Sequence, residues 1–308
     1  MGISRNILLW ASDSPWMRLH VPKWKFVKKA IKKFMPGENA EDALAAAKKF
    51  QADSIPAVFT HLGENLQHLS EGLEVRDHYL ELIDKIAEQK LDVEISLKLT
   101  QLGFDSSFEV TYERFKDITF KVREKLGNMI WIDMEGSNYT EKTLFFYKKI
   151  KSEFDNVGLC IQAYLHRTEK DLKDLMSIDG HIRLVKGAYR EPADIAFNFK
   201  NYVDRNFLHL SKELLKIKSQ KNIRVAFATH DEKICEQILR DAKHYSIPRN
   251  QVEFQMLYGI KSGYQKELAK KGYKVRVLIS YGDFWYPWYM RRLAERPANV
   301  WFVLKNIF

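Results

Sequence analysis

Eight short apolar or alternating runs recur along the chain, and each is followed by a longer stretch whose apolar residues have helical spacing. Such runs are typical of buried parallel strands, and the stretches between them are long enough for helical crossovers. The runs are 55–60, 93–99, 129–134, 157–164, 182–187, 224–229, 252–257 and 274–279. Eight βα units in about 250 residues predict an α/β protein with a (β/α)8 barrel of the TIM type. An open doubly wound sheet would also alternate, but the chain lacks a dinucleotide-binding glycine pattern, which favours the closed barrel.

The chain before the first run has a different pattern. Apolar residues within 24–34 have helical spacing, and a Pro-Gly pair at 36–37 interrupts that helix. The Ala- and Lys-rich stretch 41–50 is again helical. We therefore expect an N-terminal helical arm over residues 1–52. No linker rich in Pro, Gly or Ser divides the rest, so residues 53–308 are expected to form one barrel domain.

The segment after the last run predicts a helix that carries two adjacent arginines, Arg291 and Arg292. Pro287 suits the first turn of this helix, and Pro297 would end it. Neighbouring guanidiniums repel each other, so an anion between them would explain the pair, because arginine binds carboxylates bidentately. The alternative is a solvated basic helix end, which the interleaved aromatic residues make less favourable. We expect this helix to lie over the active site at the barrel mouth.

Polar and charged residues stand at the carboxyl ends of most runs, where a packed strand would rather carry Val or Ile. A barrel enzyme holds its catalytic groups at these ends. The residues are Lys98, Asp133, Glu135, Gln162, Arg183, Lys186, Thr229, His230, Asp231 and Gln255. Buried charges must be paired, so we expect an ion pair between Lys98 and Asp133 across adjacent strands.

Composition and charge narrow the class of protein. The 308 residues are 45% hydrophobic, and the net charge of +10 suits nucleic acid, acidic lipid headgroups or an anionic substrate. We see no exposed stripe of basic and aromatic residues, so no nucleic-acid partner is expected. The histidines lack metal-ligand spacing, so no metal is expected. No apolar stretch approaches the roughly 18 residues of a membrane span. Cys160 and Cys235, the two cysteines, predict buried free thiols in a reducing compartment.

Several short motifs follow one another at the predicted strand ends. They are His61-Leu62-Gly63-Glu64, Lys98-Leu99-Thr100-Gln101-Leu102-Gly103, Ile132-Asp133-Met134-Glu135, Gln162-Ala163-Tyr164-Leu165, Leu184-Val185-Lys186-Gly187-Ala188-Tyr189, Ala228-Thr229-His230-Asp231, Glu253-Phe254-Gln255-Met256-Leu257-Tyr258-Gly259 and the segment 291–299. Each motif alone is weak, but their order over most of the chain resembles the proline dehydrogenase family. The resemblance implies an FAD-dependent enzyme that oxidises L-proline to Δ1-pyrroline-5-carboxylate and passes the electrons to a quinone.

The resemblance also implies roles for the matching residues. The substrate pocket would be formed by Lys98, Asp133, Tyr189, Leu257, Leu278, Trp288, Arg291 and Arg292. FAD would be contacted by Met134, Gln162, Arg183, Lys186, Gly187, Ala188, Thr229 and His230. Lys98, Asp133 and Arg183 would serve the chemistry, with Arg183 stabilising the anionic reduced flavin. A Glu64–Arg291 ion pair would close a lid over the site.

Partners and location follow from the same resemblance. An enzyme that reduces a quinone works at a membrane surface without spanning it, and the lysine-rich stretch 23–33 suits such peripheral contact. The alternative for this stretch is an ordinary solvated basic helix. The expected location is the cytoplasm, with the inner face of the membrane as an option. The product would pass to a separate pyrroline-5-carboxylate dehydrogenase.

Two positions depart from the family pattern. Leu278 in the eighth run and Trp288, three residues before the arginine pair, each stand where a Tyr is usual. One interpretation is compensation, in which the larger Trp fills the space that Leu leaves and proline remains the substrate. Another is a substituted substrate such as 4-hydroxyproline, although Leu offers a hydroxyl no hydrogen bond. A flavin barrel of the methylenetetrahydrofolate reductase type and a non-catalytic barrel that binds an anionic metabolite are rival hypotheses.

Overall fold

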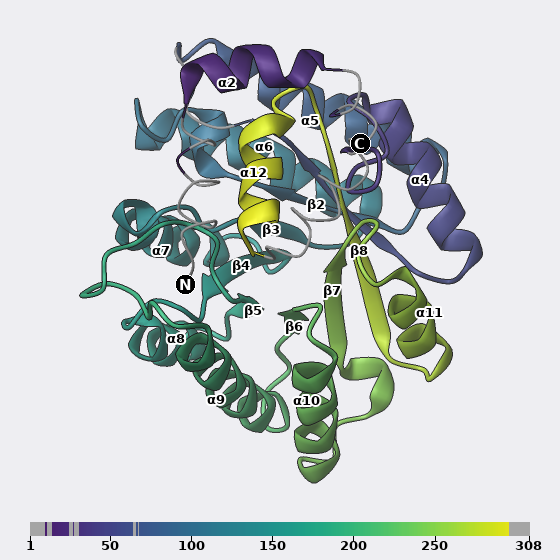
Figure 1. Cartoon of the computed structure of the whole chain (residues 1–308), viewed down its shortest axis with the longest axis vertical. Coiled ribbons are helices and arrows are strands. Elements are labelled where there is room, and N and C mark those ends of the chain that lie inside the picture. The colour runs from purple at the N-terminus through teal and green to yellow at the C-terminus, as the bar shows by residue number, and fades with distance from the viewer. Residues whose placement is uncertain are drawn as a thin grey trace.

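Eight parallel strands close into a barrel in the order β1-β2-β3-β4-β5-β6-β7-β8, with helices around it (Figure 1). The structure is a computed structural model, and it describes residues 10, 14–24, 27, 31–63, 66 and 68–295. The barrel closes between β1 and β8, in a register that runs from Ala57 opposite Val277 to His61 opposite Tyr281. The predicted closed barrel is therefore confirmed, and the open sheet is wrong.

The strands lie where the eight runs predict them. They are β1 (Ala57–His61), β2 (Val93–Leu97), β3 (Ile130–Ile132), β4 (Val157–Gln162), β5 (His181–Val185), β6 (Val225–Ala228), β7 (Glu253–Leu257) and β8 (Lys274–Tyr281). β3 ends earlier than its run, although the Asp133 amide still donates to the Leu97 carbonyl of β2 at 2.9 Å.

A helix follows each strand. The barrel helices are α5 (Glu71–Glu88), α6 (Phe108–Leu126), α7 (Ser137–Lys151), α8 (Thr168–Met176), α9 (Lys200–Lys218), α10 (Glu232–His244), α11 (Ser262–Lys270) and α12 (Trp285–Glu295). Short 3-10 turns η2 (Leu99–Leu102) and η3 (Arg249–Gln251) lie between them. Before β1 come α2 (Pro15–His20), η1 (Val21–Lys23) and α4 (Ala40–Ala52). Residues 25, 26 and 28–30 of the predicted helix over 24–34 lie outside the described residues, and residues 27 and 31 are helical.

Local sequence signals set the ends of the longest helices. Ser107 caps α6, because its side chain accepts a hydrogen bond from the Val110 amide at 3.2 Å. Gly127 ends the same helix with a φ of 60°, a conformation that glycine adopts without steric cost. The helices bury their apolar faces against the outside of the strands, which forms the main core. Both cysteines are buried and free, as predicted.

The floor of the barrel is a buried ion network. Arg224 donates to Glu94 at 2.5 Å and to Glu253 at 2.7 Å, and Arg276 lies 3.2 Å from Glu94. The Trp131 indole N–H donates to the Glu94 carboxylate at 2.8 Å. Burial alone would raise the pKa of Glu253, but Arg224 and Arg276 hold that pKa below its usual value. The lower half of the barrel is thus filled by paired charges and one large indole.

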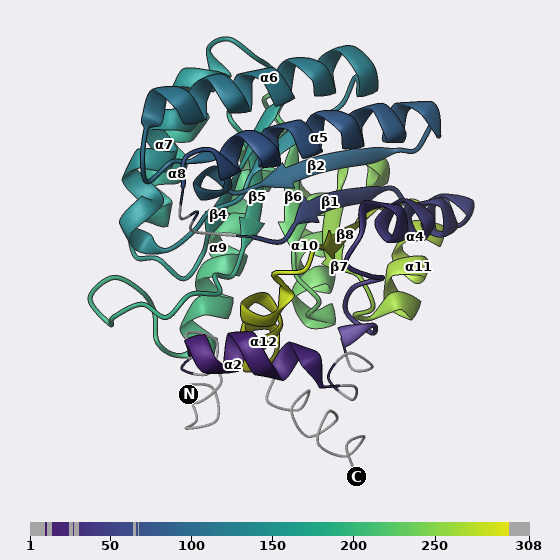
Figure 2. The ribbon, with the colours of Figure 1, turned by 90° about the horizontal axis from the view of Figure 1, so that it is seen from above.

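The N-terminal arm and α12 form a hydrophobic cluster of their own, which we call the arm–α12 cluster. Its buried members are Val21, Val27, Ile31, Phe34, Met35, Leu62, Trp285, Tyr286, Tyr289, Met290 and Leu293. Figure 2 shows α2 and α12 side by side on one flank of the molecule. α4 packs instead with the main core, against β1 and β8. The position of α12 therefore depends on residues of the arm.

Candidate active site

Arg183 occupies the barrel interior above the ion network. Its guanidinium carbon lies 4.7 Å from the centroid of the Trp131 ring, and only 2% of the residue is exposed. Its Nη1 donates to Ser96 Oγ at 2.8 Å and to Asp133 Oδ1 at 3.0 Å. The Ser96 hydroxyl also donates to Asp133 Oδ1, at 2.8 Å. Arg183 therefore joins β2, the end of β3 and β5 at one point.

The predicted ion pair between Lys98 and Asp133 is replaced by the pair between Arg183 and Asp133. The reason is geometric: Arg183 stands on the interior face of β5, and its long side chain crosses the barrel to the end of β3. Lys98, directly after β2, points its ammonium toward the rim instead. Its Nζ lies 3.4 Å from the Gly63 carbonyl, in the turn after β1.

Two buried polar groups at this point lack partners within the described part of the chain. The Nε and Nη2 of Arg183 and the Oε1 of Gln162 are shielded from solvent and make no hydrogen bond there. A buried guanidinium N–H without an acceptor is costly, so such groups are typical of a ligand site. Two donors beside one acceptor suit the carbonyl oxygens and N–H groups of an isoalloxazine ring. The interior residues therefore fit a flavin.

Gln162 and Glu135 fix the turn after β3. The Gln162 side-chain amide donates to the carbonyls of Met134 at 3.4 Å and Glu135 at 3.3 Å. The Glu135 carboxylate accepts from the Thr100 amide at 3.2 Å and from its hydroxyl at 2.7 Å. Met134 is thereby held at the carboxyl end of β3, beside the end of β4.

The turn after β5 requires a glycine. Gly187 has a φ of 109°, and a Cβ there would lie 2.2 Å from the Tyr164 ring. The Tyr164 amide donates to the Lys186 carbonyl at 2.9 Å. The Lys186 ammonium lies 2.5 Å from Asp204 and 3.8 Å from Asp231. This close backbone packing places residues 186–188 beside the end of β4.

His230 is held at the end of β6 by a neighbouring strand. The Leu257 amide donates to His230 Nε2 at 2.8 Å. A neutral ring in this arrangement carries its proton on Nδ1. Thr229 is buried, and its Oγ1 accepts from the Asp231 amide at 3.2 Å.

The two positions that depart from the family pattern lie in different clusters. Leu278 packs inside the barrel, with Val58, Trp131 and Ala226. Trp288 packs against the arm–α12 cluster. The compensation hypothesis, in which one side chain fills the space left by the other, gains no support from this placement.

For several predicted site residues the structure describes only the position along the chain or the degree of burial. Tyr189 follows the Lys186–Ala188 turn and is half-buried, and Leu257 is half-buried at the end of β7. Arg291 and Arg292 lie in the second half of α12, as predicted, but their side chains are outside the described part of the structure. Glu64 lies outside the described residues, so the lid ion pair stays a prediction.

Sequence reasoning missed three residues of the site. Ser96 and Trp131 face the barrel interior, and the two-residue alternation of β2 and β3 could have indicated this. Glu191, which binds the start of α7, lies in a loop and had no such signal.

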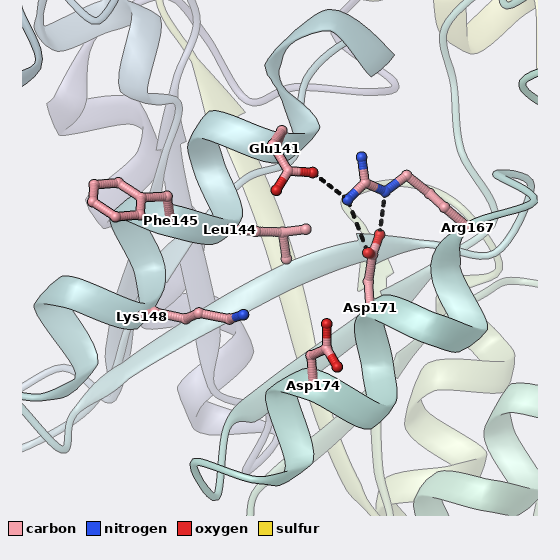
Figure 3. A pocket seen from close by; sticks show the side chains of 7 residues that line it. All are labelled: Glu141, Leu144, Phe145, Lys148, Arg167, Asp171 and Asp174. Carbon is pink, nitrogen blue, oxygen red and sulfur yellow. Dashed lines mark hydrogen bonds and ion pairs between the residues drawn. The ribbon is translucent and has the colours of Figure 1, made fainter.

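A small surface cavity between α7 and α8 is not part of the site (Figure 3). Its volume is about 100 Å³. Three of its five charged groups are engaged with one another, because Arg167 donates to Glu141 at 2.5 Å and to both carboxylate oxygens of Asp171, the nearer at 2.7 Å, while Lys148 and Asp174 also line it. It lies outside the barrel, between two helices, and apart from the residues that meet at Arg183.

The comparisons with known proteins agree with this geometry. The family model described as Proline dehydrogenase matches residues 43–305. Proline dehydrogenase 1 of Bacillus subtilis subsp. natto is 40% identical over 276 residues, which cover 90% of each chain. Proline dehydrogenase 2 of the same organism is 35% identical over 307 residues, covering 100% of this chain and 99% of the relative.

A solved structure shares the fold. Proline utilization A from Bdellovibrio bacteriovorus, inactivated by N-propargylglycine, superimposes with a TM-score of 0.79 at 25% identity. The match covers 94% of this chain but 36% of that one, so the chain spans about a third of that larger protein. The family model and the near full-length relatives together show that the chain belongs to the proline dehydrogenase family.

Proposed function

We propose that the protein oxidises L-proline to Δ1-pyrroline-5-carboxylate with FAD as its cofactor. The observation that carries the proposal is the buried Arg183, whose Nε and Nη2 lack an acceptor within the described part of the chain, next to the strand of Gln162, whose side-chain oxygen also lacks a partner there. Family membership and the curated relatives support the substrate and the redox chemistry. The rival folate-reductase type of barrel and the non-catalytic barrel are set aside by the same membership.

The residues at the strand ends divide the work. Bound FAD supplies the two-electron acceptor for the hydride that leaves C5 of the substrate. Gln162, Arg183, the Lys186–Ala188 turn and Thr229 with His230 would hold it. Arg291 and Arg292 on α12 would hold the substrate carboxylate, which fixes the ring at reacting distance. Met134 would lie against the flavin from the end of β3.

The ring nitrogen must be neutral for hydride to leave C5, because the C5–N bond becomes a double bond. Arg183 would disfavour the ammonium form through its positive charge, an effect that the paired Asp133 carboxylate reduces. Asp133 keeps Arg183 in place through the 3.0 Å ion pair. Lys98 would add a second positive charge at the rim. Tyr189, Leu257, Leu278 and Trp288 would line the pocket that excludes water.

Proline is favoured over 4-hydroxyproline by the surroundings of Leu278. That side chain packs with Val58, Trp131 and Ala226, and none of these aliphatic and ring carbons offers a hydroxyl group a partner. A polar substituent against these carbons would lose its water without gaining a hydrogen bond from them.

Anaerobic flavin bleaching tests the proposal. The purified protein should be yellow and should bleach rapidly on addition of L-proline, and much more slowly with trans-4-hydroxy-L-proline. A colourless protein that takes up no FAD would overturn the cofactor assignment. A yellow protein that proline does not bleach would overturn the substrate.

The electron acceptor would be a quinone, reached by peripheral contact with a membrane, and the product would pass to a separate dehydrogenase. Among the described residues, no helix has the length and hydropathy needed to cross a bilayer. The arm instead exposes large apolar side chains, namely Trp10, Trp16, Leu19 and Trp24. Exposed tryptophans suit the interface between headgroups and acyl chains. Sedimentation with anionic vesicles should fall when Trp16 and Trp24 are both changed to Ser.

A further inference from the structure

The first turn of α7 is capped by a carboxylate from another loop. Ser137, the first residue of α7, donates from its amide to Glu191 Oε1 at 2.8 Å and from its hydroxyl to Glu191 Oε2 at 2.5 Å. The residue before it, Gly136, has no side chain to cap the helix, and the first turn carries no acidic residue. A carboxylate at a helix N-terminus satisfies the unpaired amides and complements the helix dipole. Glu191 therefore supplies a cap that α7 itself lacks.

The same carboxylate meets the loop that follows β4. The Tyr164 hydroxyl lies 3.4 Å from Glu191 Oε1. Burial raises the pKa of Tyr164, and the negative charge of Glu191 raises it further, so the phenol stays protonated and able to donate. The Tyr164 ring also lies under Gly187, where a Cβ would clash with it. Tyr164 thus contacts the β5–α9 loop, residues 186–199, at two places.

Both ends of the β5–α9 loop are fixed by the backbone. At its start, the Lys186 carbonyl accepts from the Tyr164 amide at 2.9 Å. At its far end, the Phe197 amide donates to the Tyr164 carbonyl at 2.8 Å, and the His166 amide donates to the Ile195 carbonyl at 3.0 Å. Glu191 lies between these anchors and ties the middle of the loop to α7.

We propose that Glu191 is a positioning residue for the flavin. Its contacts fix the relative positions of the loops that follow β3, β4 and β5. This inference rests on the proposed flavin site. Met134 lies two residues before Gly136, Gln162 lies two residues before Tyr164, and the Lys186–Ala188 turn begins the Glu191 loop. A carboxylate that joins these three loops sets the distance between three groups of flavin contacts.

Flavin affinity measures this role directly. FAD would be titrated into the apoprotein and followed by fluorescence quenching, for the wild type, Glu191→Ala, Glu191→Gln and Ser137→Ala. We expect Glu191→Ala to weaken FAD binding roughly tenfold, the effect of losing one good cap. Glu191→Gln keeps an acceptor for Ser137 and should recover most of the affinity. Ser137→Ala keeps the backbone contact and should weaken binding roughly threefold.

Asp194→Asn is the matched control, because Asp194 is an exposed carboxylate of the same loop. It should bind FAD as the wild type does. With FAD at saturation, the KM for proline should stay within twofold of wild type in every variant, since the substrate clamp lies on α12.

The outcomes separate the two proposals. If the wild-type apoprotein binds no flavin, the proposed function fails. If the wild type binds FAD and both Glu191→Ala and Ser137→Ala bind it equally well, the positioning role is wrong. A purely structural cap would lower the melting temperature of the apoprotein in these variants while leaving the FAD dissociation constant unchanged. If Glu191→Ala does not fold, the Ser137→Ala and Glu191→Gln titrations decide alone.

Discussion

At the scale of single residues, Arg183 is the group on which the site depends most. A lysine at this position would keep the positive charge but lose the planar fork that reaches Ser96 and Asp133, and it would stack less well on Trp131. We expect Arg183→Lys to lower kcat roughly 100-fold, in the range seen when one preorganised donor is removed. Stopped-flow reduction of the flavin by proline measures this. A rate within threefold of wild type would contradict the role of Arg183.

His181, at the start of β5, gives the protein an acid-sensitive contact. Burial, with the nearby charges of Lys151 and Arg224, lowers the pKa of His181 to about 4. Its Nδ1 accepts from the Arg224 amide at 3.1 Å, which needs the neutral ring. The unfolded chain binds the proton more readily than the folded one, so this contribution to stability is complete above pH 6.5 and is lost as the pH falls toward 4.

The partly exposed ring should account for roughly 1–2 kcal/mol of unfolding free energy over that interval. Urea unfolding at pH 7, 5.5 and 4 measures it. His181→Asn keeps an acceptor near the Nδ1 position without titrating, so its loss of stability on acidification should be smaller by about that amount. Equal slopes for both proteins would mean that His181 does not titrate in this interval.

The residue pairing was the part of the site that sequence could not supply. The positions of Lys98 and Asp133 directly after β2 and β3 followed from the strand pattern, whereas Arg183, expected at a strand end, lies in the middle of β5. Which charge meets which depends on how the strands stagger around the barrel, and Arg183 reaches Asp133 past β4. Arg183 and Asp133 are 50 residues apart, and the sequence pattern around each of them contains no information about the other.

At the scale of elements, strands were easier to predict than the packing of the helices at the ends of the chain. All eight runs are strands, because the face of each strand that packs against the helices is apolar, which leaves an apolar or alternating run in the sequence. The predicted short helix 41–50 is α4. The dependence of α12 on the arm was not predictable, because the arm–α12 cluster joins residues from opposite ends of the sequence.

Because the position of α12 depends on the arm, a change in the arm should weaken proline binding more than it slows the chemical step. Phe34 is 5% exposed, and its ring centroid lies 5.7 Å from that of Tyr289 on α12. Phe34→Ala would leave a cavity under the helix that carries Arg291 and Arg292. We expect the KM for proline to rise roughly tenfold while kcat changes less than threefold, because the proposed carboxylate clamp loses its support and the proposed interior site does not.

Phe50→Ala is the control for general loss of stability. Phe50 packs against the main core, and its ring centroid lies 5.9 Å from that of Tyr258 rather than against the arm–α12 cluster. It should lower the melting temperature without raising the KM. Steady-state kinetics of both variants would show whether the arm supports the clamp, and an unchanged KM for Phe34→Ala would contradict that.

At the scale of the whole molecule, the barrel interior is a continuous column of charge and aromatic surface. Glu94 on the floor accepts from the Trp131 indole, and the guanidinium carbons of Arg224 and Arg183 lie 5.3 and 4.7 Å from the Trp131 ring centroid. Gly158 makes room for the indole, because a Cβ there would lie 2.4 Å from it. The floor that closes the barrel thus also supports the arginine of the site.

A substitution at Glu94 should separate the stability of the fold from the function of the site. Glu94 is fully buried, accepts hydrogen bonds from Arg224 and Trp131, and forms an ion pair with Arg276. In Glu94→Gln the two guanidiniums would keep Glu253 as their buried acidic partner, and an uncompensated buried charge costs about 3–5 kcal/mol of unfolding free energy. Guanidinium chloride unfolding at pH 7 measures the loss.

The matched control is Glu41→Gln, which removes an exposed carboxylate that pairs with Lys85 at 2.6 Å. Exposed ion pairs contribute little, so its midpoint should match the wild type. Because Asp133 and Ser96 still hold Arg183, the folded fraction of Glu94→Gln should retain wild-type FAD affinity and a kcat within about fivefold. If Glu94→Gln is as stable as the wild type, the ion network on the barrel floor does not depend on the charge of Glu94. If Glu94→Gln shows the predicted loss of stability and also no longer binds FAD, then Trp131 transmits the geometry of the floor to the site.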